Sequence, residues 1–230
     1  MKKILILISA TFLSGIAICQ QVADLPANSF PFNLTGTTIQ TFDDRHEGVV
    51  GYYTFFEDFS AGIVELKNKG VYKNVLINYD AVSDNLIAKS ERISSAMVVR
   101  KDLVQQFVLS DGVREFKFIK LSVNGLPTYL LVLVEGDLTF YCKTTKSIKR
   151  ADLGGAYNTS ESRNDEFRSV NTYYIADRVG LRELPQTKKG IIRSFPHMED
   201  KLNVFFKKNK INFSDHAEAQ FLFEFIQENR

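Results

Sequence analysis

The stretch GIVELKNKGVYKNVLINYD, residues 62–80, decides the fold because its apolar residues recur with the spacing of a β-strand. Val64 and Leu66 alternate with Glu65 and Lys67, and this period of two gives a strand one apolar face and one face turned to water. We therefore expect a half-buried strand that ends near Lys67.

The residues that follow predict two more strands and the turns between them. Asn68-Lys69-Gly70 favours a turn, since glycine adopts a positive φ without steric cost. Asp80 to Asn85 is rich in turn-forming residues, and a third short strand is expected from Leu86 to Lys89. The second strand carries its apolar side chains on one face, at Val75, Ile77 and Tyr79. Together these elements predict an antiparallel three-strand meander.

Further strands are expected along the chain as far as residue 184. Turn sequences occur at Ser110-Asp111-Gly112, Asn124-Gly125 and Glu135-Gly136-Asp137. The apolar alternation changes parity at Ile119, which predicts either a β-bulge or burial on both faces. The apolar run Thr128 to Val134 predicts a central strand covered on both faces. The expected strands are 94–99, 102–109, 113–121, 128–134, 138–144, 170–176 and 179–184.

The composition changes twice after these strands. Lys149 to Phe167 is rich in Gly, Asn and Ser, which predicts a long mobile loop. From Pro185 the apolar period becomes helical. Ser214-Asp215 is a capping sequence for a last helix. The first helix has an apolar stripe of Met198, Leu202, Phe205 and Phe206, and the second has a face of Ala217, Phe221, Leu222, Phe225 and Ile226. We expect the stripe of Leu202, Phe205, Phe221 and Phe225 to dock on the sheet.

The predicted fold class is α+β with β dominant. We expect an antiparallel meander sheet or open barrel of about nine or ten strands, with a C-terminal two-helix segment. The expected organisation is a signal peptide at 1–19, an extended lead segment at 20–50 with one strand at 37–42, an antiparallel β domain at 51–184, and a helical segment at 185–230 packed on the β domain.

An aromatic lead-in, GYYTFFEDFSAG at residues 51–62, precedes the first hairpin. Adjacent aromatic residues on a strand point to opposite faces. The lead-in is therefore either a plug for the core or an exposed stacking surface for a glycan or peptide. Its aromatic residues are Tyr52, Tyr53, Phe55, Phe56 and Phe59.

This lead-in, with a hairpin that ends in Tyr79-Asp80, resembles an uncharacterised family of exported proteins common in Bacteroidota. The resemblance continues at TKKGIIRSFP, residues 187–196, and at KKNKI, residues 207–211, so that it covers roughly residues 51 to 227. It implies export and a β-rich body, and it implies no activity.

The N-terminus has the pattern of a signal peptide. Met1-Lys2-Lys3 is followed by the apolar run Ile4 to Ile18, which at ~15 residues is shorter than the ~20 that a membrane-spanning helix requires. Ala17 and Cys19 favour cleavage before Gln20, which predicts an exported protein, periplasmic or extracellular, with no transmembrane segment in the mature chain. The alternative is a lipoprotein anchored through Cys19.

The charge of the mature chain bears on its possible partners, and its cysteine content bears on its possible disulfides. Removal of residues 1–19 removes Lys2 and Lys3 from the 29 Lys and Arg residues, which leaves 27 against 27 Asp and Glu. A nucleic-acid-binding protein presents a basic excess, so we expect no nucleic-acid partner. Cys142 is then the one remaining cysteine, which excludes an internal disulfide, and its position beside Leu138 and Phe140 predicts a buried, inert thiol.

One cluster has the residue types of a metal or acid–base site. His46 stands among Asp43, Asp44 and Glu47, although consecutive loop residues do not all converge on one ion. His197 and His216 follow helix-start signals and are expected to be structural. The C-terminal segment is locally basic, which indicates a solvated face or a surface for anionic lipid or envelope polymer. Its cations are Lys188, Lys189, Arg193, Lys201, Lys207, Lys208 and Lys210.

The function expected from these patterns is a non-catalytic exported module of the cell envelope, with a binding or structural role. The chain lacks Gly-X-Ser-X-Gly, His-Glu-X-X-His and a zinc-spaced cysteine pair. We therefore assign no catalytic, cofactor-binding or metal residue, and we expect an envelope protein or polymer as partner. The alternative is a metal-assisted hydrolase that uses Asp43, Asp44, His46 and Glu47.

Overall fold

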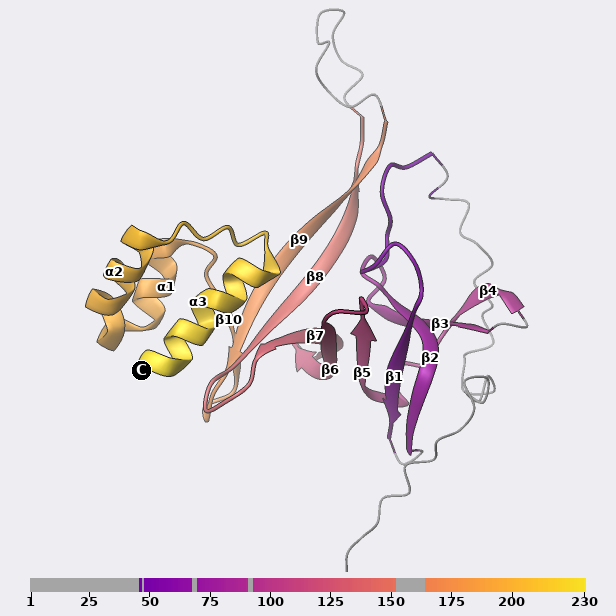
Figure 1. Cartoon of the computed structure of the whole chain (residues 1–230), viewed down its shortest axis with the longest axis horizontal. Coiled ribbons are helices and arrows are strands. Elements are labelled where there is room, and N and C mark those ends of the chain that lie inside the picture. Colours follow the sequence, from indigo (N-terminus) through magenta and orange to yellow (C-terminus); the bar gives the residue numbers. More distant parts are fainter. Residues whose placement is uncertain (1–45, 47, 68–69, 91–92, 152–163) are drawn as a thin grey trace, which may run out of the picture.

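The computed structural model describes residues 46, 48–67, 70–90, 93–151 and 164–230. Ten strands form one antiparallel sheet in the order β10-β9-β8-β7-β6-β5-β1-β2-β3-β4, which leaves β10 and β4 at its edges (Figure 1). The sheet is not closed, and helices follow it at the C-terminal end of the chain, so the predicted α+β, β-dominant class is confirmed. The strands are β1 Ser60–Leu66, β2 Gly70–Asp80, β3 Asn85–Ser90, β4 Ile93–Val98, β5 Val104–Ser110, β6 Glu115–Val123, β7 Leu126–Val134, β8 Thr139–Lys149, β9 Glu166–Ala176 and β10 Leu181–Leu184.

The three-strand meander predicted from residues 62–90 is present as β1, β2 and β3. The side chains expected to face the core are buried, at Val64, Leu66, Val75, Ile77 and Tyr79. The β2–β3 turn is held by Asp80, whose carboxylate accepts hydrogen bonds from the amides of Val82 (2.9 Å) and Ser83 (3.0 Å). Asn68 and Lys69 of the predicted β1–β2 turn lie outside the described residues.

The strand order departs from a single meander because β5 pairs with β1 and not with β4. The link at residues 99–103 starts where the Val99 amide donates to the Leu86 carbonyl and ends where the Leu103 carbonyl accepts from the Lys67 amide. Six Cα-to-Cα steps lead from Val98 to Val104, which could span about 21 Å if fully extended. The Leu103 amide donates to the Arg100 carbonyl over 3.1 Å, and this turn shortens the link to about 18 Å, whereas four strand spacings come to about 19 Å. The sheet must therefore curl to bring the end of β4 near the start of β5, in a connection of Greek-key type.

Glycine at position 62 permits the β1–β5 contact. A Cβ atom there would collide with the Val108 carbonyl oxygen of β5 and with the Ile77 side chain of β2. The pairing of β1 with β2 also shifts register between Gly62 and Val64. The absence of a side chain therefore lets three strands approach closely at this point.

Two predicted turns join the next strands. Asp111 in the β5–β6 turn accepts hydrogen bonds from the amides of Val113 (2.9 Å) and Arg114 (2.7 Å). Asn124 and Gly125 join β6 to β7 with φ of 51° and 81°, which is the backbone of a two-residue hairpin turn of type I′.

The parity change at Ile119 comes from burial on both faces and not from a bulge. β6 pairs with β5 and with β7 in unbroken register. Phe118 belongs to the main core, whereas Ile119 packs on a second cluster on the opposite face, with Leu130 of β7. β7 is covered on both faces as predicted, since Leu131 lies in the main core.

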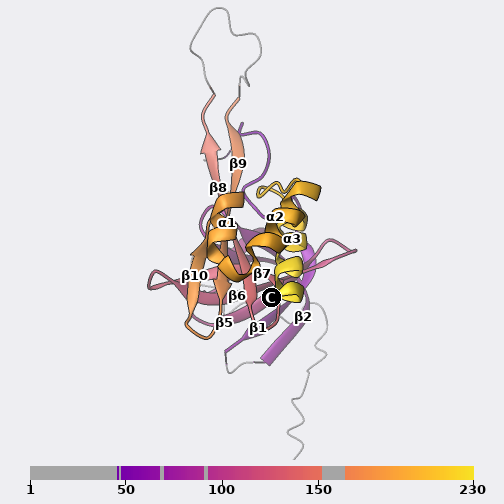
Figure 2. The same ribbon diagram turned by 90° about the vertical axis from the view of Figure 1, so that its left-hand side faces the viewer.

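Strands β8 and β9 are longer than the sequence predicted, and their register runs from Thr139–Ala176 to Lys149–Glu166. Their distal residues, 145–149 and 166–170, form an arm that projects from the body of the sheet (Figures 1 and 2). The expected loop at 149–167 therefore has both ends in paired strands, and its interior, 152–163, lies outside the described residues.

The C-terminal segment contains three α-helices where two were expected: α1 Lys188–Ser194, α2 Glu199–Lys208 and α3 His216–Asn229, with a 3-10 turn at Pro196–Met198 before α2. Thr187 caps α1 by accepting from the Gly190 amide. Asp215 caps α3 by accepting from the amides of Ala217 and Glu218. Figure 2 shows the helices gathered in front of the sheet when the molecule is viewed from their side.

The predicted apolar face of α3 is confirmed at Leu222 and Ile226, which are buried, and is wrong at Phe221. Phe221, expected in the core, is 50% exposed, and its ring contacts Phe205 of α2 at a centroid distance of 5.3 Å. Phe225 also packs on Phe205, at 4.5 Å. The residues of α3 that are buried are Ala219, Leu222, Phe223 and Ile226. One set of apolar residues on α3 therefore packs on α2 and another packs on the sheet. The apolar pattern of the sequence does not separate these two faces.

Candidate functional site

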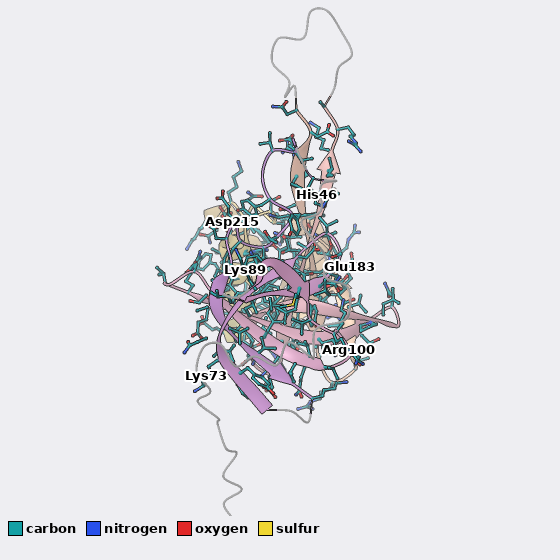
Figure 3. The ribbon with its side chains drawn as sticks, turned by 90° about the vertical axis from the view of Figure 1, so that its right-hand side faces the viewer. His46, Lys73, Lys89, Arg100, Glu183 and Asp215 are labelled. Atoms are coloured by element: carbon teal, nitrogen blue, oxygen red, sulfur yellow. The ribbon has the colours of Figure 1, made fainter. Side chains whose placement is uncertain are left out.

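His46, the centre of the suspected metal cluster, packs between aromatic rings. Its ring centroid lies 5.3 Å from that of Tyr53 and 5.1 Å from that of Phe167 of the arm, and Figure 3 shows it beside the β8–β9 ribbons. Its Nδ1 is buried without a hydrogen-bond partner among the described residues. Three partners suggested by the sequence, Asp43, Asp44 and Glu47, lie outside the described residues. Within the described part of the chain, no group of three or more His, Cys, Asp or Glu side chains is arranged to hold a metal ion.

The aromatic lead-in divides between the two roles considered for it. Phe55 packs against Phe116 and Phe118 of β6, with centroids 5.3 and 5.2 Å apart, so it plugs the core. Tyr52 is 39% exposed and is capped by Lys146, whose ammonium lies 3.8 Å from the ring centroid. This part of the surface therefore combines a partly exposed aromatic ring with a cation.

Lys146 is held by the backbone of the lead-in. Its ammonium donates to the carbonyls of Tyr52 (2.9 Å) and Thr54 (2.7 Å). Burial lowers the pKa of Lys146 to about 8, since desolvation disfavours the charged form. The lysine fastens the lead-in to the base of the arm, a contact that nothing in the sequence pattern indicated.

A shallow hollow of about 460 Å³ lies beside the lead-in, between its C-terminal end and the β5–β6 turn. Phe56 and Phe59 form its apolar wall, and Asp58 and Asp111 contribute carboxylates. The Asp111 carboxylate is already bonded to turn amides and to the Arg114 guanidinium. This hollow therefore exposes the aromatic rings of Phe56 and Phe59 and the carboxylate of Asp58.

The thiol of Cys142 is buried as expected. Its side chain is 0% exposed in the main core, and burial raises the pKa of the thiol to about 12. The thiolate is the reactive form of cysteine, so this residue is not suited to act as a nucleophile at neutral pH.

His216 fastens the start of α3 to the sheet. Its Nε2 lies 3.1 Å from Thr144 Oγ1 of β8 and 3.1 Å from Asn171 Oδ1 of β9. Asn171 also donates to the Ser214 carbonyl over 3.0 Å, and the His216 ring stacks on Phe55 at 5.9 Å. Burial lowers the pKa of His216, and this effect outweighs the opposing charge of Asp215. The structural role expected for this histidine is thus supported by its contacts.

A partly buried ion pair lies where the β4–β5 link meets the β2–β3 turn. Lys101 Nζ lies 2.7 Å from Asp84 Oδ2, and the Tyr79 hydroxyl donates to Asp84 Oδ1 over 2.9 Å. The Lys101 ammonium also lies 4.9 Å from the centroid of the Tyr129 ring. This cluster joins segments distant in the chain, and the Tyr129 hydroxyl within it is buried without a hydrogen-bond partner among the described residues.

A cleft of about 420 Å³ opens at the end of the sheet opposite the arm. Figure 1 shows α3 ending close to the turns at this end of β8, β9 and β10. We call it the basic cleft, and define it by its charged and titratable lining: Asp137, Asp177, Arg178, Arg182, His197 and Arg230. The side chains of this lining include three guanidinium groups and two carboxylates, which together carry one formal positive charge when His197 is neutral.

The carboxylates of the basic cleft leave its cations largely available. Asp177 accepts hydrogen bonds from the amides of Val179 (2.8 Å) and Gly180 (3.2 Å), which lower the pKa of its carboxyl group, and it stands 3.7 Å from Arg182 Nε. Asp137 is 84% exposed and stands 3.9 Å from the Arg230 guanidinium. Both ion pairs are longer than a hydrogen-bonded contact.

His197 is the one candidate histidine that the structure leaves open to solvent, in the 3-10 turn before α2. Sequence reasoning assigned it a structural role and did not connect it with Arg178 or Arg182. The cleft is assembled from two hairpin turns and two helical segments, which no linear motif encodes.

The basic residues of the C-terminal helices are exposed, in agreement with a solvated face. The Lys201 ammonium donates to the Asn229 carbonyl over 2.7 Å, and the Lys188 ammonium lies 5.8 Å from the Phe206 ring centroid. Among the described helices, none has the length and apolar character needed to cross a membrane.

Comparison of the chain with protein-family models, with curated proteins and with solved structures found no match.

Proposed function

We propose that this chain is an exported, non-catalytic module of the cell envelope that binds a partner. The observation that carries the proposal is the basic cleft, whose guanidinium groups face solvent. Cys142 and His216, by contrast, are built into the core and into the attachment of α3. A recess that is open and lined by charged side chains is suited to binding a ligand.

Export is inferred from the basic start and apolar run of residues 1–18, and it agrees with the resemblance to exported Bacteroidota proteins. Expression of the full chain in a Gram-negative host, followed by fractionation and intact-mass measurement, tests it. We expect an envelope-fraction protein that begins at Gln20. A diacylglyceryl group on Cys19 would instead establish the lipoprotein alternative, and an uncut cytoplasmic chain would contradict export.

The hydrolase alternative is tested with the same mature protein. Zinc or manganese is titrated calorimetrically into the protein that begins at Gln20, with the His46→Ala variant as control. A binding module without a metal centre gives no heat that depends on His46. Stoichiometric binding that disappears in His46→Ala would contradict the proposal and support a metal site with Asp43, Asp44 or Glu47.

A further inference from the structure

Arg178 is the most available cation of the basic cleft. It lies in the β9–β10 turn, its side chain is exposed, and it makes no hydrogen bond or ion pair with any described residue. Arg182 follows on β10, where its Nε lies 3.7 Å from a carboxylate that turn amides already occupy. Two guanidinium groups from one hairpin therefore converge on the cleft with unused donors.

Guanidinium groups have a specific preference among ligands. Each presents a planar fork of N–H donors that matches the two oxygens of a carboxylate or phosphate. The basic cleft adds an imidazole, from His197, and a third guanidinium, from Arg230. These donors come from separate elements, so they surround the recess and do not form a flat surface.

The remaining lining gives the cleft an apolar wall. Phe195 is buried, Leu138 is half-buried, and Val179 is 96% exposed at the rim. The Ser194 hydroxyl donates to the Gly190 carbonyl over 3.0 Å, so its proton is already used inside α1. The volume of about 420 Å³ falls within the roughly 300–1,000 Å³ of small-molecule sites.

We propose that the basic cleft binds a small ligand through an oxyanion group, either a carboxylate or a phosphate. This inference rests on the proposed binding role and assigns its ligand chemistry. Arg178 and Arg182 clamp the oxyanion, His197 and Arg230 contact its far side, and the apolar part of the ligand lies against Phe195 and Leu138. The two acidic residues limit the excess charge, which favours a ligand with one or two negative charges.

The test is calorimetric titration of the mature protein, at low ionic strength, with inorganic phosphate and separately with succinate. Arg178→Ala removes the guanidinium group that is most available to a ligand. Arg178→Lys keeps the positive charge but lacks the paired N–H donors of a guanidinium group. Arg168→Ala is the matched control. Arg168 is an exposed arginine of the arm, paired with Glu166, so its removal changes the net charge equally. Circular dichroism melting of each variant establishes that it is folded.

We expect wild-type protein to bind at least one of the two anions. The affinity should fall about tenfold in Arg178→Ala, less in Arg178→Lys, and remain unchanged in Arg168→Ala. Tighter binding of succinate would indicate that the ligand carries a carboxylate, and tighter binding of inorganic phosphate that it carries a phosphate. Absence of binding for both anions, unchanged affinity in Arg178→Ala, or an equal loss in Arg168→Ala would overturn the proposal. Each of these failures would leave the export and metal tests of the proposed function intact.

Discussion

The ring of Phe223 lies parallel to the ring of Phe140, with centroids 4.6 Å apart and 7° between their planes. Phe223 is on α3 and Phe140 is on β8, and both are fully buried. Tyr173 of β9 closes the stack, with its centroid 5.4 Å from that of Phe223. These rings join the last helix to two strands of the sheet.

Phe223→Ala should therefore lower the free energy of unfolding by ~3–5 kcal/mol, because it leaves a cavity in a packed core. Phe221→Ala is the control on the same helix, and it should cost about 1–2 kcal/mol because that ring is half exposed. Urea denaturation of both variants measures the difference. An equal loss in the two variants would contradict the orientation of α3.

His216 makes stability depend on pH. Burial lowers the pKa of the folded histidine below its ordinary 6.5, so the unfolded chain binds the proton more readily. The contribution of neutral, buried His216 to the free energy of unfolding is complete above pH 6.5. It decreases as the pH falls below that value, because the unfolded chain then takes up the proton first. Asp215 opposes the shift and Arg114 adds to it.

Melting temperatures measured between pH 8 and pH 5 should fall more steeply for the wild type than for His216→Gln. The other titrating groups are common to both proteins, so the difference between the curves isolates this residue. Parallel curves would show that His216 is not buried between β8, β9 and Phe55.

Cys142 should resist alkylation in the native protein. Its thiol is inaccessible, and its pKa of about 12 leaves little thiolate at pH 8. Iodoacetamide should label the mature chain only after unfolding in urea, as followed by intact mass. Rapid labelling of the folded protein at pH 8 would mean that the thiol is exposed.

The lysines at the end of α2 should contribute little to folding. Lys207, Lys208 and Lys210 are exposed, and single surface charges are worth ~0–1 kcal/mol. Replacing all three by Gln should leave the melting temperature and the envelope association unchanged. A folded variant that detaches from membranes or cell-wall material would make these helices, and not the basic cleft, the binding surface.

Local sequence patterns predicted the strands, but they did not predict the contacts between segments that are distant in the chain. The alternation at Val64 and Leu66 and the turn at Asn124-Gly125 are properties of neighbouring residues, so sequence alone placed them. The pairing of β1 with β5 depends on the curl of the whole sheet and on the missing side chain at Gly62.

The basic cleft was missed for the same reason. Arg178 and Arg182 belong to a hairpin, whereas His197 and Arg230 lie in the helical segment, and packing of α1 and α3 against the sheet brings them together. His46 was singled out because its acidic neighbours are adjacent in sequence. The structure places its ring against Tyr53 and Phe167, and those acidic neighbours lie outside the described residues.

A nitrogen-15 NMR titration of the mature protein with inorganic phosphate and with succinate tests the basic cleft most directly. Amide shifts should concentrate at Arg178, Arg182 and His197, and residues of the arm should not respond. Shifts confined to the α2 lysines or to the surroundings of His46, with the cleft silent, would contradict this prediction.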